Sequence, residues 1–160
     1  MAAVYVGFFG KTGVKVMGEV LVKEATIYVT KIDRERLGKL IEIARERDGD
    51  ANREYLNRLE EELERAETVE PQEVSPDVIT MRSKVRLKDL RTGEEVVYSL
   101  VFPTEADFSA GKISVLAPVG TAMLGYRRGD VIEWVVPSGL RRLRVEEILY
   151  QPESAGAYHL

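Results

Sequence analysis

The chain has 160 residues, of which 44% are hydrophobic and 31% are charged, and it carries a formal net charge of −4 with no cysteine. This size and composition suit one ordinary globular domain, or a small domain with an appendage. Disulfides and thiolate metal sites are excluded, and the acidic balance argues against a protein that binds a nucleic-acid backbone by charge alone.

Residues 1–25 read as an N-terminal extension whose structure the sequence leaves open. Residues 14–16 and 19–22 alternate weakly, as strands do, and several glycines argue against a helix. Lys and Glu side chains interrupt the apolar residues well before the ~18 that a membrane span needs, and no charged signal-peptide start precedes them. We therefore expect a soluble, cytoplasmic protein.

Two amphipathic helices are expected within residues 26–70, where acidic residues outnumber basic ones. The first takes its N-terminal cap from Asp33 or Thr30. Its apolar stripe comprises Leu37, Leu40, Ile41, Ile43 and Ala44. The second takes its cap from Asp50 or Asn52, and its stripe has the spacing of a coiled-coil seam, with Leu56, Leu59, Leu63 and Ala66. Because only a short turn joins them, the helices are predicted to form a projecting antiparallel coiled-coil hairpin.

The tip of this hairpin carries two carboxylates, Asp48 and Asp50. Hard oxygen ligands suit Mg²⁺, but two carboxylates alone bind it weakly. Roles as turn and cap residues explain both side chains more simply, because Asp is common at such positions. We expect no metal site and no cofactor, and we keep the tip as a weak candidate site.

The pattern changes after a linker at residues 71–77, which contains two prolines and ends the second helix. Runs with the alternation and composition of strands then occur at 78–81, 84–88, 96–102, 131–136 and 143–150. Turn residues lie at 92–93 and 137–139, and Pro118 begins a short helix that ends at Gly125. The sequence thus predicts an α+β protein in which an antiparallel sheet with one short helix follows the helical hairpin.

Residues 78–160 also resemble a known family. Seven short motifs occur in the order found in the C-terminal domain of Gre transcript-cleavage factors, at 85–89, 98–101, 105–107, 113–120, 122–125, 129–130 and 137–139. The ending at 150–158 resembles the tail of the Rnk family, the regulators of nucleoside diphosphate kinase. The resemblance covers about residues 25–160 and leaves the first 24 outside it.

This resemblance implies an FKBP-like sheet domain that carries a coiled-coil hairpin. Gre-type proteins use the sheet domain to hold RNA polymerase at the rim of its secondary channel. Their hairpin enters that channel, where acidic tip residues help to position a catalytic Mg²⁺. Nucleic acid would be contacted only through the polymerase complex.

The resemblance assigns polymerase docking to one loop, formed by Leu116, Ala117, Pro118, Val119 and Gly120. Ala117 stands where Gre factors typically have Ser, so an apolar contact replaces a polar one. The alternative is that Pro118 only begins a helix. The first predicted helix spans about 15 residues, or ~22 Å at 1.5 Å per residue, whereas Gre hairpins are much longer. We therefore predict that the protein does not stimulate transcript cleavage.

The leading hypothesis is a Rnk-type regulator that binds RNA polymerase, competes there with Gre-like factors and is not an enzyme. One alternative is a true Gre-like cleavage and elongation factor. Another is an FKBP-like prolyl isomerase, for which the predicted strands offer only Tyr98, Phe102, Trp134 and Tyr150 as aromatic lining. A contact with nucleoside diphosphate kinase is suggested by the family name alone, which an indirect effect explains equally well.

Overall fold

A computed structural model describes residues 5–9, 14–17, 20–23 and 26–158. Near the N-terminus it contains β1 (Tyr5–Phe9), β2 (Val14–Met17) and β3 (Val20–Lys23), which form an antiparallel sheet in that order. The weak alternation in this part of the sequence therefore does correspond to strands. Within the described residues, no helix is long and apolar enough to cross a membrane.

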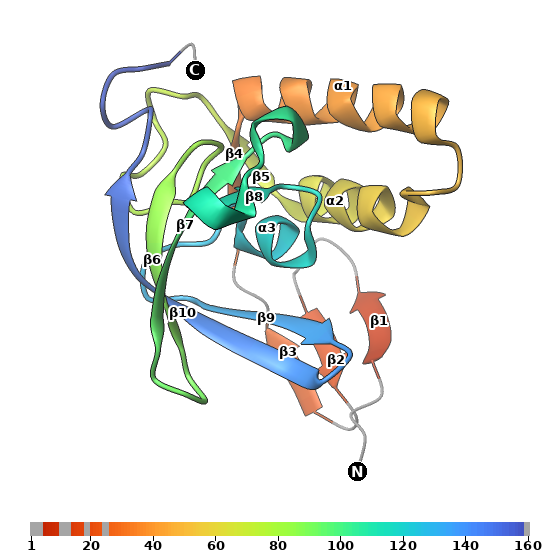
Figure 1. The fold of residues 1–160 in the computed structure, drawn as a ribbon, viewed down its shortest axis with the longest axis vertical. Helices are drawn as coiled ribbons and strands as arrows, with labels where there is room; N and C mark the ends of the chain where they lie inside the picture. Colours follow the sequence, from red (N-terminus) through yellow and green to blue (C-terminus); the bar gives the residue numbers. More distant parts are fainter. Residues whose placement is uncertain (1–4, 10–13, 18–19, 24–25, 159–160) are drawn as a thin grey trace.

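The helical part is a crossover between two short parallel strands (Figure 1). Its elements in chain order are β4 (Tyr28–Thr30), α1 (Lys31–Asp48), α2 (Arg53–Arg65) and β5 (Glu67–Val69). Parallel strands need a long connection, and here the two helices supply it. The β4–β5 pair thus joins the two ends of the hairpin at its base, a feature that the helical periodicity did not predict.

Thr30, one of the two expected caps, is the N-terminal cap of helix α1. The Thr30 hydroxyl oxygen accepts a hydrogen bond from the Asp33 backbone N–H at 3.1 Å, so Asp33 is the third residue of the helix and not its cap. Asn52 occupies the cap position of α2, but its side chain makes no capping hydrogen bond. The alternative cap, Asp50, lies in the turn before it.

The two helices run antiparallel, as predicted. The Arg34 guanidinium donates to the Ala66 carbonyl at 2.9 Å near the base, and the Arg45 guanidinium reaches Glu60 at 2.6 Å nearer the tip. The buried seam consists of Leu37, Ile41, Ala44, Leu56, Leu59 and Leu63. The expectation for Ile43 was wrong: its side chain is 61% exposed, because two residues beyond Ile41 is about 200° around a helix.

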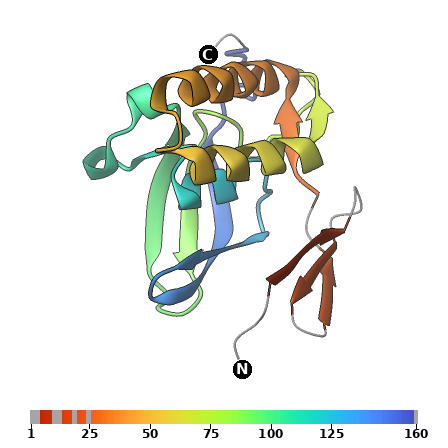
Figure 2. The same ribbon diagram turned by 90° about the vertical axis from the view of Figure 1, so that its right-hand side faces the viewer.

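The hairpin does not project freely from the sheet part, contrary to expectation. Its seam residues belong to one continuous hydrophobic cluster with residues of the sheet part, among them Ile79, Met81 and Leu124. Figures 1 and 2 both show the helices lying against the part of the molecule that contains α3 (Pro118–Met123). A helix pair this short buries more apolar surface by sharing a core than by covering only itself.

The main sheet has five strands in the order β8-β7-β6-β10-β9. Their bounds are β6 (Lys84–Asp89), β7 (Glu95–Val101), β8 (Lys112–Ser114), β9 (Val131–Val136) and β10 (Gly139–Tyr150). All pairs are antiparallel except β7 with β8, so the sheet is mixed and not purely antiparallel as predicted. The connection from β7 to β8 contains two short 3-10 turns, η2 (Pro103–Glu105) and η3 (Phe108–Ala110).

The predicted strand at 78–81 is absent. Val78 makes a single bridge with Arg127, and residues 80–83 form a turn in which Arg82 has a positive φ of 64°. Side chains from distant parts of the chain bind the backbone here, including the Asp33 carboxylate on the Met81 N–H. Residues 78–81 are therefore apolar because they are buried between the helices and the sheet, and not because they form a strand. The mixed α+β class is confirmed, whereas the FKBP-like and coiled-coil descriptions stay predictions.

Candidate functional site

The predicted docking loop, Leu116 to Gly120, follows the edge strand β8 and enters helix α3. Leu116 and Val119 are half-buried and pack against the hydrophobic core, and each keeps part of its side chain at the surface. Ala117 occupies the cap position of the helix without a side-chain hydrogen bond, and Pro118 is the first helical residue. Pro118 therefore does begin a helix, and a docking role for this loop is an additional hypothesis.

Hydrogen bonds from the Ser114 and Thr121 side chains and from the backbone fix the loop on both sides. The Ser114 hydroxyl accepts from the Leu116 N–H at 3.1 Å, and the Ser114 carbonyl accepts from the Ala117 N–H at 3.0 Å. The Thr121 hydroxyl donates to the Val115 carbonyl at 2.5 Å and is buried. The loop therefore presents its apolar side chains from a defined backbone.

Gly120 is required by close packing at the same place. A Cβ atom added there would lie 2.0 Å from the Ser114 carbonyl oxygen, far inside any real contact distance. Helix α3 thus rests directly on the backbone at the end of β8, and a side chain at position 120 would push the loop away.

The tip carboxylates are engaged by neighbouring cations and amides. Asp48 accepts from the Arg47 guanidinium at 2.7 Å and from the Asn52 amide at 2.9 Å, and these hydrogen bonds, Arg47 first, lower the pKa of Asp48 to about 2. Asp50 is largely exposed and lies 3.4 Å from Arg53. In the described part of the chain, no group of three or more acidic or histidine side chains is arranged to hold a metal ion.

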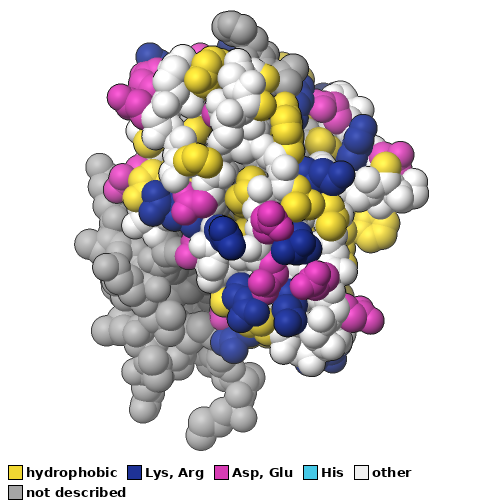
Figure 3. All heavy atoms as spheres, turned by 90° about the vertical axis from the view of Figure 1, so that its left-hand side faces the viewer, with side chains coloured by type: hydrophobic (Ala, Val, Ile, Leu, Met, Phe, Trp, Pro, Cys, Tyr) yellow, Lys and Arg dark blue, Asp and Glu magenta, His cyan; other side chains and the backbone are white. Residues whose placement is uncertain are grey.

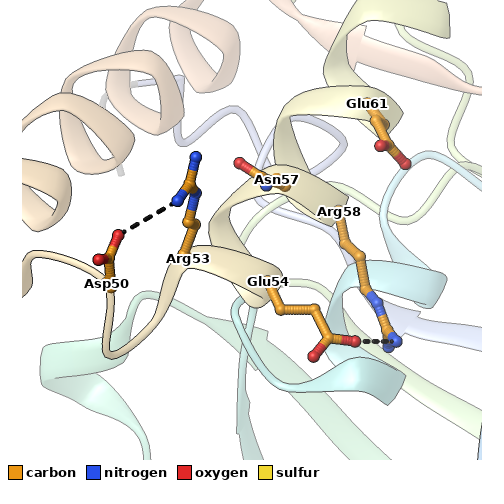
Figure 4. Close-up of a pocket in the computed structure, with 6 residues that line it drawn as sticks. All are labelled: Asp50, Arg53, Glu54, Asn57, Arg58 and Glu61. Carbon is orange, nitrogen blue, oxygen red and sulfur yellow. Dashed lines mark hydrogen bonds and ion pairs between the residues drawn. The ribbon is translucent and has the colours of Figure 1, made fainter.

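A shallow hollow lies on the outer side of α2, near the tip (Figure 4). It is lined by Asp50, Arg53, Glu54, Asn57, Arg58 and Glu61. Its charges pair with one another, at 3.4 Å for Asp50 with Arg53 and at 2.6 Å for Glu54 with Arg58. This hollow offers solvated ion pairs rather than the apolar enclosure typical of a small-molecule site.

The aromatic side chains considered for a prolyl isomerase do not line this hollow. Tyr98, Phe102 and Trp134 are half-buried and pack against the hydrophobic core, while Tyr150 is 40% exposed at the end of β10. Tyr98, Phe102 and Trp134 therefore take part in the packing of the sheet part.

Alternating charges cover the outer face of the sheet. Figure 3 shows Lys and Arg side chains mixed with Asp and Glu side chains over β6 and β10. Arg86 lies 2.8 Å from Glu147, and Arg142 lies 2.9 Å from Glu133. Because neighbouring charges of opposite sign offset one another, this face has no uniform potential with which to attract a polyanion.

The helical periodicity of the sequence did not predict the role of Asp33 in joining distant parts of the chain. Its carboxylate is buried and accepts a hydrogen bond from the Met81 N–H at 3.1 Å, across a sequence separation of 48 residues. Burial raises the pKa of Asp33 to about 6, and the nearby Glu153 carboxylate adds to this effect. The opposing influences are the Met81 hydrogen bond, the charge of Arg36 and the bond with Thr30. Asp33 therefore links the hairpin to the sheet part.

Comparisons with known proteins agree with this architecture. Residues 73–150 match the family described as transcription elongation factor, GreA/GreB, C-term, and residues 26–69 match the Rnk N-terminus. The solved structure of the prokaryotic transcription elongation factor GreA/GreB from Nitrosomonas europaea superposes with a TM-score of 0.64 at 42% identity, covering 78% of this chain and 100% of that one.

Two curated relatives match most of the chain. The regulator of nucleoside diphosphate kinase of Escherichia coli (strain K12) is 42% identical over 136 residues, which is 84% of this chain and 97% of the relative. The transcription elongation factor GreA of Desulfotalea psychrophila is 36% identical over 147 residues, which is 83% of this chain and 91% of that protein.

The fold and these matches define the class first: the protein is a homologue of the GreA/GreB transcription elongation factors. Within that class the chain belongs to the Rnk family of regulators, since it carries the Rnk N-terminus and covers nearly the whole length of such a regulator. The resemblance noted in the sequence is thereby confirmed.

Proposed function

We propose that this protein is a transcription regulator that binds RNA polymerase at the rim of the secondary channel and competes there with Gre-like factors. It performs no chemistry of its own and does not stimulate transcript cleavage. The observation that carries the proposal is the double similarity of the chain, to a Rnk regulator over 97% of that protein and to a GreA factor over 91%.

The loop from Leu116 to Gly120 is the proposed docking element. Its half-exposed aliphatic side chains stand on a backbone fixed by Ser114 and by helix α3. A fixed loop loses little conformational entropy when a partner binds, which favours its use as a contact. The apolar character of Leu116 and Val119 suits a partner surface that is itself partly apolar.

Two properties of the hairpin support the proposal that the protein does not stimulate transcript cleavage: the length of its helices and the chemistry of its tip. Helix α1 has 18 residues, or ~27 Å at 1.5 Å per residue. At the tip, Asp48 is already engaged by Arg47 and Asn52, and Asp50 faces Arg53. Carboxylates that are paired with local cations are poor ligands for an additional Mg²⁺, because the metal must displace those partners.

Binding is tested by pull-down with core RNA polymerase at micromolar concentration. The informative variant is Leu116→Ala with Val119→Ala, which truncates the loop and is expected to weaken capture. Its matched control is Leu90→Ala with Leu140→Ala, which truncates two leucines that are 42% and 45% exposed, one in the turn after β6 and one in β10. If the folded wild-type protein is not captured, the proposal fails; if both double variants bind equally, the loop assignment fails.

Cleavage is tested on a backtracked polymerase complex. The expected result is no RNA shortening above background. Shortening that disappears on Asp48→Ala with Asp50→Ala would show that the hairpin reaches the active centre, and would favour the Gre-like alternative. A contact with nucleoside diphosphate kinase is suggested only by the name of the family, and direct binding of the purified proteins tests it separately.

A further inference from the structure

Phe108 is the most exposed large hydrophobic side chain in the part of the chain for which burial is described. It is 79% exposed, and the two alanines on either side of it, Ala106 and Ala110, are exposed as well. Single exposed hydrophobic residues are common on protein surfaces and need no explanation alone. Here, however, the aromatic ring is presented from a well-defined turn at one edge of the sheet.

The turn that presents Phe108 is closed by backbone hydrogen bonds. Asp107 and Lys112 bridge each other, with N–H to carbonyl distances of 3.0 and 2.9 Å. Within this bridge, the Ala110 N–H donates to the Asp107 carbonyl at 3.1 Å, and the Gly111 N–H donates to the Phe108 carbonyl at 3.0 Å. The turn is therefore a compact structure and not an open loop.

The turn is also attached firmly to the sheet. Gly111 has a positive φ of 72°, and a Cβ atom there would lie 2.9 Å from the Val97 carbonyl oxygen. The Gly111 carbonyl accepts from the Ser99 N–H of β7 at 2.8 Å. A backbone so fixed has little motion to lose on binding, which lowers the entropic cost of using Phe108 as an anchor residue.

The charges of the turn are satisfied within it. The Asp107 carboxylate accepts from the Ser109 hydroxyl at 2.6 Å, and this bond together with backbone N–H groups and the charge of Lys112 lowers the pKa of Asp107. A partner that covers the turn therefore does not need to provide a cation for Asp107. The chemistry that fits Phe108 is an apolar recess on a protein surface.

The position of the turn connects it with the docking loop. Strand β8 is at one edge of the five-stranded sheet; the Phe108 turn leads into it and the loop from Leu116 follows it. Three residues of strand span only ~10 Å, whereas a standard interface covers roughly 800 Å² of each partner. One partner surface is thus large enough to cover both. Figure 2 shows the segment around η3 extending beyond the body of the molecule.

We propose that Phe108 is an anchor residue that inserts into an apolar recess of the same RNA polymerase surface on which the docking loop rests. This inference rests on the proposed function. It assigns to one continuous edge of the sheet both the aliphatic loop and the aromatic ring, with β8 between them.

The test measures the Kd for core RNA polymerase with the full-length wild-type chain, Phe108→Ala, Phe108→Leu and the control Leu90→Ala. Phe108→Ala is expected to weaken binding by roughly tenfold or more, as truncation of an anchor does. Phe108→Leu should restore part of the affinity, and Leu90→Ala should bind as the wild type does. Thermal unfolding should be unchanged in Phe108→Ala, because its ring makes few contacts.

Three outcomes would overturn the inference, and they separate it from the proposed function. If Phe108→Ala binds with wild-type affinity while the docking-loop variant binds more weakly, Phe108 is not an anchor residue, but the proposal of polymerase binding stands. If the wild-type chain does not bind core RNA polymerase, both the anchor role of Phe108 and the proposed function fail. A concentration-dependent dimer that Phe108→Ala converts to monomer, with polymerase affinity unchanged, assigns the ring to a second copy of this chain instead.

Discussion

Among the carboxyl groups in the described part of the chain, Asp33 is the one whose ionisation we expect to affect stability near neutral pH. Replacing it by Asn keeps an oxygen that accepts from the Met81 N–H but removes the charge. A pKa raised from 3.8 to about 6 corresponds to about 3 kcal/mol, since each pKa unit is worth about 1.4 kcal/mol. We take this value as an upper bound for the gain of Asp33→Asn at pH 8.

The direction of the pH dependence follows from the two pKa values. Below pH 3.8 the Asp33 carboxyl is protonated in the folded and the unfolded chain alike, so the contribution of the neutral carboxyl to the free energy of unfolding is fully present. Between pH 3.8 and about 6 only the unfolded chain releases the proton, and the free energy of unfolding therefore falls as pH rises. Above about pH 6 the loss is complete.

Urea unfolding between pH 4 and pH 8 measures this effect. The difference between Asp33→Asn and the wild type should be small near pH 4 and should grow to its maximum by about pH 7, where both wild-type states are ionised. The control Asp50→Asn removes a carboxyl that is 90% exposed, and its curve should run parallel to the wild type. Asp33→Ala should lose about 1–3 kcal/mol near pH 4, because it leaves the Met81 N–H unpaired. A difference between wild type and Asp33→Asn that does not vary with pH would refute the reasoning.

Three further predictions concern packing, each measured as the change in free energy of unfolding. Gly120→Ala should destabilise the protein by about 3 kcal/mol or more, because the new Cβ meets the Ser114 carbonyl oxygen; an unchanged midpoint would contradict the close approach. Gly38→Ala should stabilise it by about 0.5–1 kcal/mol, since nothing lies within 4 Å of the added atom. Leu59→Ala, at a fully buried position, should cost about 2–5 kcal/mol, whereas Ile43→Ala should change stability by less than about 0.5 kcal/mol. Equal effects of the two substitutions would contradict the assignment of Leu59 to the buried seam and of Ile43 to the exposed face.

Local patterns predicted the helices well, because the residues that form them also lie next to one another in space. The spacing of Leu37, Ile41 and Ala44 requires only helical geometry to place them on one face of α1. The exposed position of Ile43 follows from the same geometry and marks where the expected stripe was too wide.

Features that depend on distant partners were not predicted. Asp33 carries a local capping signal, but its role comes from the Met81 N–H, which the chain brings to it only on folding. Residues 78–81 have the composition of a strand because they are buried, not because they pair. Strand β8 has only three residues, too few for a periodic signal. The proposed docking role of residues 116–120 rests on family resemblance alone, since these residues carry no distinctive chemistry.

The parallel pairing of β4 with β5 has a consequence for how the chain tolerates being cut. The exposed turn between α1 and α2 lies far along the hairpin from that pair, with Gly49, Asp50 and Ala51 all open to solvent. A protease nick there would produce two fragments that still share the β-pair, the leucine seam and the bond between Asp33 and Met81. We therefore expect the hairpin tip to be the place where this protein can be divided into two fragments that stay associated without a covalent link.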